Sequence, residues 1–285
     1  MTQQTSFALG LIGAGIAASL TPAMQEHEGL ACGLNLTYRR IDAGIQRFTS
    51  ADLPDVLDWT RRLGFDGFNV THPFKQAIIP LLDDLTEDAH DLGAVNTVLV
   101  RDGRLIGTNT DWSGYGQAFR RVLPDAVHDR VVLVGAGGAG SAVGYALLHQ
   151  GAEHVSVVDV DREHADSCVT RLAKVFGDDR VSVATDVAAA LDEAQGLVNA
   201  TPIGMLGKEG MPIAADLLRR DLWVSDVVYF PLETELIERA RERGCRVVPG
   251  GGMAVFQAAD AFRHFTGLTP DADRMIRHFE ELTVR

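Results

Sequence analysis

The sequence predicts an α/β fold divided between two domains. The chain has 285 residues, and because a domain averages about 150 residues, that length favours two domains over one. Apolar runs of strand length alternate with helical patterns over nearly the whole chain, which is typical of the α/β class. Beyond about residue 130 the apolar runs become continuous, as strands do in a parallel sheet that helices cover on both faces.

In the first third of the chain, turn and cap residues locate the elements. The predicted strands there are residues 7–12, 36–41 and 67–70, and the predicted helices are residues 21–33 and 52–63. Thr21 is a good N-cap and Pro22 suits a first helical position, so the first helix begins there. Gly64 ends the second helix. A proline-containing turn at residues 71–73 is expected to open one more helix.

The middle and the end of the chain give clearer patterns. Residues 95–100 and 104–107 predict a hairpin, because the Asp102-Gly103 pair between them favours a tight primed turn. The later strands are predicted at residues 131–134, 154–158, 181–184, 197–199, 223–228 and 246–248. Residues 254–266 are strongly helical, and a last helix is expected to follow them.

Composition excludes several classes of partner. A formal net charge of −13 leaves no broad basic surface for nucleic acid or an anionic membrane, so a small-molecule substrate is expected. The apolar run at residues 7–18 is too short to span a bilayer, and no Lys or Arg precedes Arg39, so it does not read as a signal peptide. Three cysteines without metal-site spacing or disulfide density predict a reduced, cytoplasmic protein and no metal.

A glycine-rich turn of the form G-x-G-x-x-G directly follows the predicted strand at 131–134 and opens a helix running to about residue 150. It consists of Gly135, Ala136, Gly137, Gly138, Ala139 and Gly140. Such a turn lets the backbone approach a pyrophosphate at the positive end of a helix. Asp159 ends the next strand, 19 residues after Gly140, where an acidic side chain binds a ribose 2′-hydroxyl and repels a 2′-phosphate. The pattern predicts a dinucleotide site that favours NAD over NADP.

Arg162 leaves a second interpretation of this site open. Its guanidinium could stack on an adenine or bind a 2′-phosphate, although a solvated helix face is the more frequent environment for such a side chain.

A second glycine-rich turn, Gly13-Ala14-Gly15, resembles the first but is predicted not to bind a nucleotide. A helix beginning near Gly15 would place Pro22 in its interior, where proline removes a hydrogen bond. Residues 13–20 are therefore expected to form a loop that presents Ser19 and Thr21 to a polyol or carboxylate ligand, with capping and turn formation as the alternative role.

Six ordered blocks together resemble the shikimate/quinate dehydrogenase family. They are Asn-Val-Thr-His-Pro-Phe-Lys at residues 69–75, Gly-Ala-Val-Asn-Thr at 93–97, Gly-Thr-Asn-Thr-Asp at 107–111, the glycine turn at 135–140, Asn-Ala-Thr-Pro-Ile-Gly-Met at 199–205, and Gly252-Met253 continuing through Gln257 to Phe262. The blocks lie between residues 69 and 262, and the resemblance as a whole covers about residue 9 to residue 267.

The resemblance implies reversible oxidation of the 3-hydroxyl of shikimate or quinate, with a nicotinamide as hydride acceptor. It gives Lys75 the place of the catalytic lysine and Asp111 that of its partner. The implied substrate contacts are Ser19, Thr21, Thr71, Asn96, Tyr229 and Gln257. The implied cofactor contacts, beyond the glycine turn, Asp159 and Arg162, are Thr201, Pro202, Val227, Gly250 and Met253.

The motif order also implies how the chain is divided. Residues 1–111 and 250–285 are expected to form a mainly parallel α/β substrate domain, and residues 112–249 a Rossmann dinucleotide-binding domain, with a cleft between them. A homodimer is a further expectation that no residue pattern specifies.

Three departures from the family pattern bear on specificity. In the loop before Pro22, Ala18 stands where histidine is common and Thr21 replaces a serine, as in quinate-accepting members. Gln25-Glu26 replaces a His-Asn pair that is common after the proline, and residues 159–161 lack the arginine of NADP-dependent members. They favour an NAD-linked quinate/shikimate dehydrogenase, in quinate catabolism or aromatic amino acid biosynthesis. The alternatives are an NADP-dependent biosynthetic shikimate dehydrogenase and a sensor that binds quinate or shikimate without turnover; the presence of both Lys75 and Asp111 disfavours the sensor.

Overall fold

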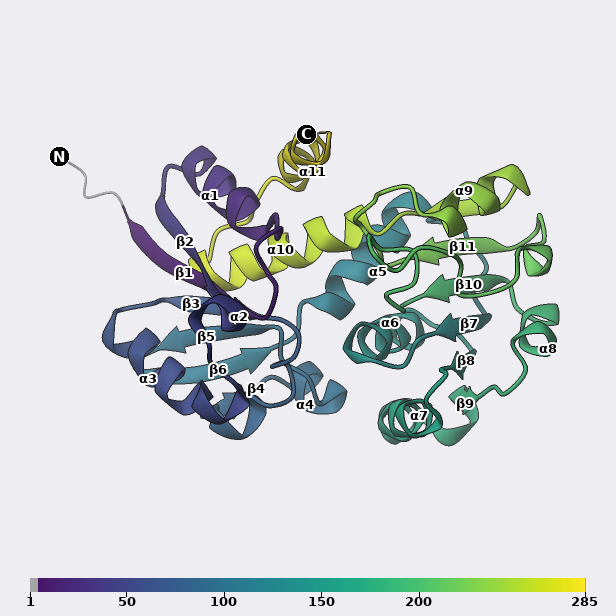
Figure 1. The fold of residues 1–285 in the computed structure, drawn as a ribbon, viewed down its shortest axis with the longest axis horizontal. Coiled ribbons are helices and arrows are strands. Elements are labelled where there is room, and N and C mark those ends of the chain that lie inside the picture. The colour runs from purple at the N-terminus through teal and green to yellow at the C-terminus, as the bar shows by residue number, and fades with distance from the viewer. Residues whose placement is uncertain (1–4, 285) are drawn as a thin grey trace. The chain divides into compact units, whose positions relative to one another are not determined.

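The computed structural model describes residues 5–284, which form two compact units, each built around its own sheet (Figure 1). The first unit runs to Thr110 and takes in the chain again from Gln257 onward. The second unit is one continuous segment, Asp111–Phe256. The boundary near the C-terminus falls inside α10 (Gly251–Thr266), so this helix begins in the second unit and ends in the first.

The first unit has a mixed sheet of order β2-β1-β3-β5-β6-β4. Its strands are β1 (Ser6–Gly13), β2 (Asn35–Asp42), β3 (Gly67–Val70), β4 (Asp84–Leu85), β5 (Thr97–Arg101) and β6 (Arg104–Thr108). β1 is parallel to β2 and β3, whereas β5 is antiparallel to both β3 and β6. The carboxyl ends of β1, β3 and β6 and the start of β5 therefore share one edge of the sheet.

The helices of this unit pack their apolar faces against a core that contains aromatic side chains. They are α1 (Thr21–Ala31), α2 (Ala43–Gln46), α3 (Leu53–Arg62), α4 (Glu87–Leu92), α11 (Ala272–Thr283) and the C-terminal part of α10. Phe68, Phe74 and Phe265 are among its fully buried side chains. Their burial stabilises the fold of this unit strongly, because each aromatic ring removes a large apolar area from water.

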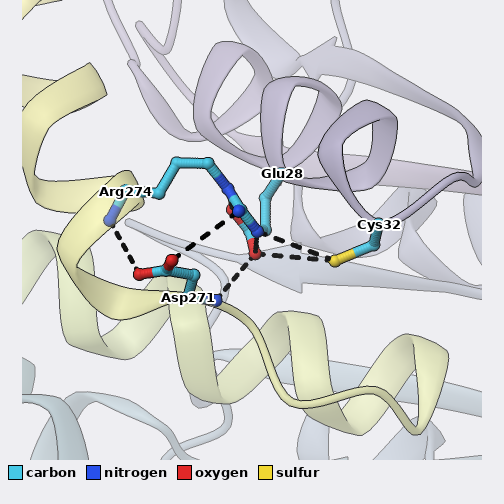
Figure 2. A network of polar contacts seen from close by, with 4 residues as sticks. All are labelled: Glu28, Cys32, Asp271 and Arg274. Atoms are coloured by element: carbon cyan, nitrogen blue, oxygen red, sulfur yellow. Dashed lines mark hydrogen bonds and ion pairs between the residues drawn. The ribbon is translucent and has the colours of Figure 1, made fainter.

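The first and last helices are joined by a buried ion pair (Figure 2). Glu28 of α1 is 0% exposed, and its carboxylate accepts two hydrogen bonds from the Arg274 guanidinium, at 2.8 and 2.6 Å. The backbone N–H of Asp271 donates a third at 2.8 Å. Cys32 lies beside this pair, and burial, followed by the neighbouring Glu28 charge, raises the pKa of its thiol. The Arg274 guanidinium compensates the negative charge of Glu28, which would otherwise be costly to bury.

The second unit has an all-parallel sheet of order β12-β11-β10-β7-β8-β9. Its strands are β7 (Arg130–Val134), β8 (His154–Val158), β9 (Val181–Val183), β10 (Gly196–Asn199), β11 (Trp223–Asp226) and β12 (Arg246–Val248), and its helices include α5 (Asp111–Val122), α6 (Gly138–His149), α7 (Arg162–Phe176), α8 (Val187–Asp192) and α9 (Glu235–Glu242). α6 and α7 cover one face of the sheet and α8 and α9 the other (Figure 1). This is the Rossmann order, and its switch point lies between β7 and β10.

Most predicted elements are confirmed, including the hairpin, in which Asp102 and Gly103 have φ of 51° and 77° as a primed turn requires. The helix predicted after the turn at 71–73 is wrong: residues 75–78 form turns, followed by a 3₁₀ turn at Ile79–Leu81. The Lys75 carbonyl, which a helix would direct toward the N–H of Ile79, accepts a hydrogen bond from Val95 N–H. Pro80 could not have continued a helix bond either.

Thr21 is also corrected, from N-cap to first helical residue: Leu20 is the N-cap, and no side chain caps α1 in the described part of the chain. Among residues 5–284 no helix has both the length and the apolar composition needed to cross a membrane. Cys32, Cys168 and Cys245 carry free thiols, and the cytoplasmic location stays a prediction.

Candidate active site

The glycine turn lies at the switch point of the second unit, in contact with the loop that follows β10. Gly135 has φ of +102°, and a β-carbon there would come within 2.7 Å of the Ala200 carbonyl carbon. A β-carbon at Gly140 would lie 1.9 Å from the carbonyl oxygen of Gly135. Any larger residue would thus collide with backbone, so the sequence uses glycine to bring the two loops and α6 together.

The turn offers anion-binding groups at the start of α6. Gly137 is its N-cap, and no side chain among residues 5–284 caps this terminus. Asp159, at the end of β8, is half-buried, and its carboxylate accepts a 2.7 Å hydrogen bond from Ala136 N–H and a 2.9 Å bond from Asp161 N–H. A positive helix end beside a fixed carboxylate fits a dinucleotide, with pyrophosphate at the helix and ribose at Asp159.

Arg162, the first residue of α7, is exposed and directed at its own helix. Its Nε lies 2.9 Å from both carboxylate oxygens of Asp166, one turn further along. This is the solvated-face arrangement considered for Arg162 in the sequence. A bound 2′-phosphate would compete with Asp166 for that guanidinium.

The glycine-rich turn at residues 13–15 has its amides satisfied internally. The Asp42 carboxylate, at the end of β2, accepts hydrogen bonds from Gly15 N–H at 3.2 Å and Ile16 N–H at 2.9 Å. Burial alone would raise the pKa of Asp42, but these backbone bonds and one from Gly44 hold it below its usual value. A protein carboxylate thus occupies these amides, and no helix begins within residues 5–20.

Loops after β10, β11 and β12 meet beside the switch point. Thr201 Oγ1 donates to Asn199 Oδ1 at 2.7 Å, and Val227 N–H donates to the Asn199 carbonyl at 2.9 Å. A β-carbon at Gly250 would come within 2.6 Å of the Val227 carbonyl oxygen. The structure therefore brings Thr201, Val227 and Gly250 together.

The remaining predicted residues of this unit line the same loops and the start of α10. Pro202 is exposed beside Thr201, and Met253 is half-buried in the first turn of α10. Tyr229 is 37% exposed, and desolvation raises the pKa of its phenol, which therefore stays a neutral donor near pH 7.

In the first unit, the polar residues predicted to contact substrate gather at one edge of the sheet. Asn96 is 3% exposed; its Oδ1 accepts from Thr110 N–H at 2.8 Å, and its Nδ2 donates to Gln257 Oε1 at 3.5 Å. Thr71, after β3, donates its N–H to the Ile12 carbonyl at 2.9 Å.

The loop after β1 meets this edge too, because Ala14 N–H donates to the His72 carbonyl at 3.0 Å. It carries Ser19, whose Oγ accepts a long hydrogen bond from Thr21 N–H at 3.4 Å, and Thr21 itself, which is half-buried.

Three residues that hold this polar group in place, Asn69, Thr97 and Tyr38, were not predicted individually. Asn69 Nδ2 donates to Thr97 Oγ1 at 2.8 Å and to the Asn96 carbonyl at 3.2 Å, and Tyr38 Oη donates to Asn69 Oδ1 at 2.6 Å. Burial raises the pKa of Tyr38, so it remains a donor. Asn69 lies in the 69–75 block, which gave a signal, whereas nothing in the sequence around Tyr38 indicates its contact.

Lys75 and Asp111 occupy different units. Lys75 is half-buried between two core anchors, Phe74 and Ile78, which are 2% and 0% exposed and fix the backbone on which it stands. Asp111 is 7% exposed and begins α5 directly after Thr110. A carboxylate there is favoured by the positive end of the helix.

The chain is similar over nearly its whole length to proteins of one family. The family described as shikimate dehydrogenase substrate binding domain matches residues 11–98. A shikimate dehydrogenase (NADP(+)) of Pseudarthrobacter chlorophenolicus is 49% identical over 99% of this chain and 97% of its own length. A quinate/shikimate dehydrogenase (NAD(+)) of Corynebacterium efficiens is 47% identical over 97% of this chain and 99% of its own. The solved quinate dehydrogenase from Corynebacterium glutamicum in complex with NAD has a TM-score of 0.92 and 45% identity, covering 98% of this chain and 100% of that one.

Proposed function

The chain belongs to the shikimate dehydrogenase family, an oxidoreductase family that acts on a CH–OH group, and on that premise we propose that it is an NAD-linked quinate/shikimate dehydrogenase. The observation that carries the NAD assignment is the Asp159 carboxylate, which lies at the glycine turn where a 2′-phosphate would have to fit.

Hydride loss from a carbinol carbon requires that a base remove the hydroxyl proton. We assign that role to Lys75, with Asp111 as the acidic partner that orients it and shares the substrate hydroxyl. A nicotinamide held at the glycine turn and Asp159 would supply the hydride chemistry, as acceptor in oxidation and as donor in the reverse direction. In that reverse direction, the Lys75 ammonium polarises the ketone and returns the proton.

Neutral hydrogen-bonding groups would hold the substrate ring. Ser19, Thr21, Thr71, Asn96 and Gln257 come from the first unit and Tyr229 from the second. Thr110 and Thr97 fix the amide of Asn96 through hydrogen bonds. Groups held in this way need not reorganise when they bind ring hydroxyls.

Asp159→Ser is expected to reduce the preference for NAD over NADP about tenfold, because it removes the charge that repels a 2′-phosphate. The measurement is the ratio of kcat/KM for NAD⁺ and NADP⁺. Asp159→Asn is the matched variant: it can still accept from Ala136 N–H, so a shift shared by both variants comes from the charge and not from loosening the turn. A wild-type enzyme that uses NADP⁺ more efficiently would contradict the assignment.

Thr21→Ser should move specificity toward shikimate relative to quinate, by about three- to tenfold in the ratio of kcat/KM values, because the lost methyl widens the wall beside the ligand. Thr37→Ser, on exposed β2 surface, makes the same chemical change away from these loops and serves as the control. An unaltered ratio in Thr21→Ser would show that Thr21 does not determine the preference between shikimate and quinate.

An NADP-dependent shikimate dehydrogenase is the second candidate, favoured by the 49% identity to an NADP(+)-named relative. A spectrophotometric matrix of shikimate and quinate against NAD⁺ and NADP⁺ separates the two. Turnover of quinate with NAD⁺ supports the first; turnover confined to shikimate with NADP⁺ supports the second. Binding of quinate or shikimate without turnover would make the protein a sensor.

A further inference from the structure

A buried carboxylate outside the predicted site residues joins two of its loops. Asp226, the last residue of β11, is 1% exposed, and no residue pattern assigns it a role. Its Oδ1 accepts from Asn199 Nδ2 at 3.0 Å and from Val228 N–H at 2.9 Å, and its Oδ2 accepts from Thr234 Oγ1 at 2.7 Å. The carboxylate thus receives three donors and connects β10, the segment after β11 and the start of α9.

Two partners of Asp226, Asn199 and Val228, lie in the predicted cofactor loops. Asn199 Nδ2 also donates to the Ile203 carbonyl at 3.0 Å, and Asn199 Oδ1 accepts from Thr201 N–H at 3.0 Å. Val228, bonded to Asp226 through its N–H, lies between Val227 and Tyr229. Displacement of this carboxylate would therefore move Thr201 on one side and Val227 and Tyr229 on the other.

We propose that Asp226, in its ionised form, is the positioning residue that fixes the loops after β10 and β11 for dinucleotide binding. The inference rests on the proposed function, because that function places the cofactor at these loops. Asp226 acts through the loops, in the way that hydrogen-bonded supporting groups orient the residues that contact a ligand.

The hydrogen-bond pattern fits the ionised form. All three neighbours donate, and Thr234 Oγ1 already accepts from Ile237 N–H at 3.3 Å. If Asp226 were protonated on Oδ2, the Thr234 hydroxyl would have to turn away and lose its acceptor. Burial raises the pKa of Asp226 to about 6, opposed by the bonds from Thr234, Val228 and Asn199. These are neutral groups, and no charged side chain in residues 5–284 contributes to the shift.

Two opposite pH dependences follow. Because the folded pKa lies above the unfolded value, Asp226 stabilises the fold most at acid pH, and that contribution is lost as pH rises through about 6. Dinucleotide affinity should change in the other direction, since the ionised carboxylate orders the loops. If Asp226 only stabilised the fold, dinucleotide affinity and fold stability would change with pH in the same direction and not in opposite directions.

The test compares Asp226→Asn with the wild type across pH. The Kd of whichever of NAD⁺ and NADP⁺ the wild type binds more tightly is measured by fluorescence titration between pH 5 and 8. At pH 8 the variant should bind about tenfold more weakly, because a hydrogen bond to a charged group has been replaced. At pH 5, where the wild-type carboxylate is also neutral, the ratio of the two Kd values should approach one. KM for the dinucleotide should rise more than kcat falls.

A second pair of variants keeps the proposal testable if Asp226→Asn unfolds. Thr234→Val removes one donor to the carboxylate and should weaken dinucleotide binding, whereas Thr234→Ser retains the hydroxyl and should restore it. Thr60→Val is the matched control, a buried threonine of α3 in the first unit whose Oγ1 donates to the Leu57 carbonyl at 2.8 Å. It should leave the Kd unchanged.

Two outcomes separate the proposals. A Kd ratio that stays constant from pH 5 to 8, or a Thr234→Val Kd equal to that of wild type, overturns the role of Asp226 alone. A wild-type protein that binds neither dinucleotide overturns the proposed function as well.

Discussion

Lys75→Ala is expected to lower kcat about 10²- to 10⁴-fold while quinate or shikimate still binds, because the substitution removes the acid/base group and leaves the hydrogen-bonding residues in place. Stopped-flow or steady-state kinetics with saturating dinucleotide would measure it. The fold should survive, since Phe74 and Ile78 anchor the segment and the Lys75 carbonyl keeps its bond from Val95 N–H.

Lys174→Ala is the control for the loss of a lysine. Lys174 is exposed on α7, and its removal should leave kcat unchanged. Lys75→Arg adds information, because a guanidinium keeps the charge but does not deprotonate near neutral pH. If Lys75→Ala retained wild-type kcat, the assignment of the base would be wrong.

Gly140→Ala should weaken dinucleotide binding by at least about 100-fold and destabilise the second unit by about 3 kcal/mol. The added methyl would stand 1.9 Å from the Gly135 carbonyl oxygen, and a backbone atom cannot swing away as a side chain can. Thermal unfolding should begin about 10 °C lower, and isothermal titration would give the Kd.

Gly137→Ala separates crowding from a general intolerance of the turn. A β-carbon at Gly137 would meet no atom within 4 Å among the described residues, so this variant should unfold near the wild-type temperature. Equal thermal losses in Gly137→Ala and Gly140→Ala would show that close packing of Gly135 against Gly140 is not the reason for glycine at 140.

The sequence could predict those features that depend on residues close together in the chain. The glycine turn and Asp159 are close in sequence and have fixed spacing, so pattern alone located them. Pro22 excluded a helix from Gly15. Asp42 ends the strand after the second turn as Asp159 does after the first, but only the structure shows that its carboxylate binds the Gly15 and Ile16 amides.

The failures have the same origin in long-range contacts. A helix was predicted after residue 73 because its propensity is local, and the hydrogen bond that prevents it comes from Val95, twenty residues away. The Tyr38 contact with Asn69 reaches from β2 across β1 to β3, and the Asp226 contact with Asn199 joins the neighbouring strands β11 and β10, so both depend on tertiary folding. No periodicity within one segment carries that information.

The ion pair between Glu28 and Arg274 has a consequence for synthesis on the ribosome. Glu28 emerges early, but the guanidinium that compensates its buried carboxylate is 246 residues further along the chain. The second unit, Asp111–Phe256, is complete before that arginine is made. We therefore expect the inserted unit to mature first during translation, while the first unit stays unfinished until Arg274 has left the exit tunnel.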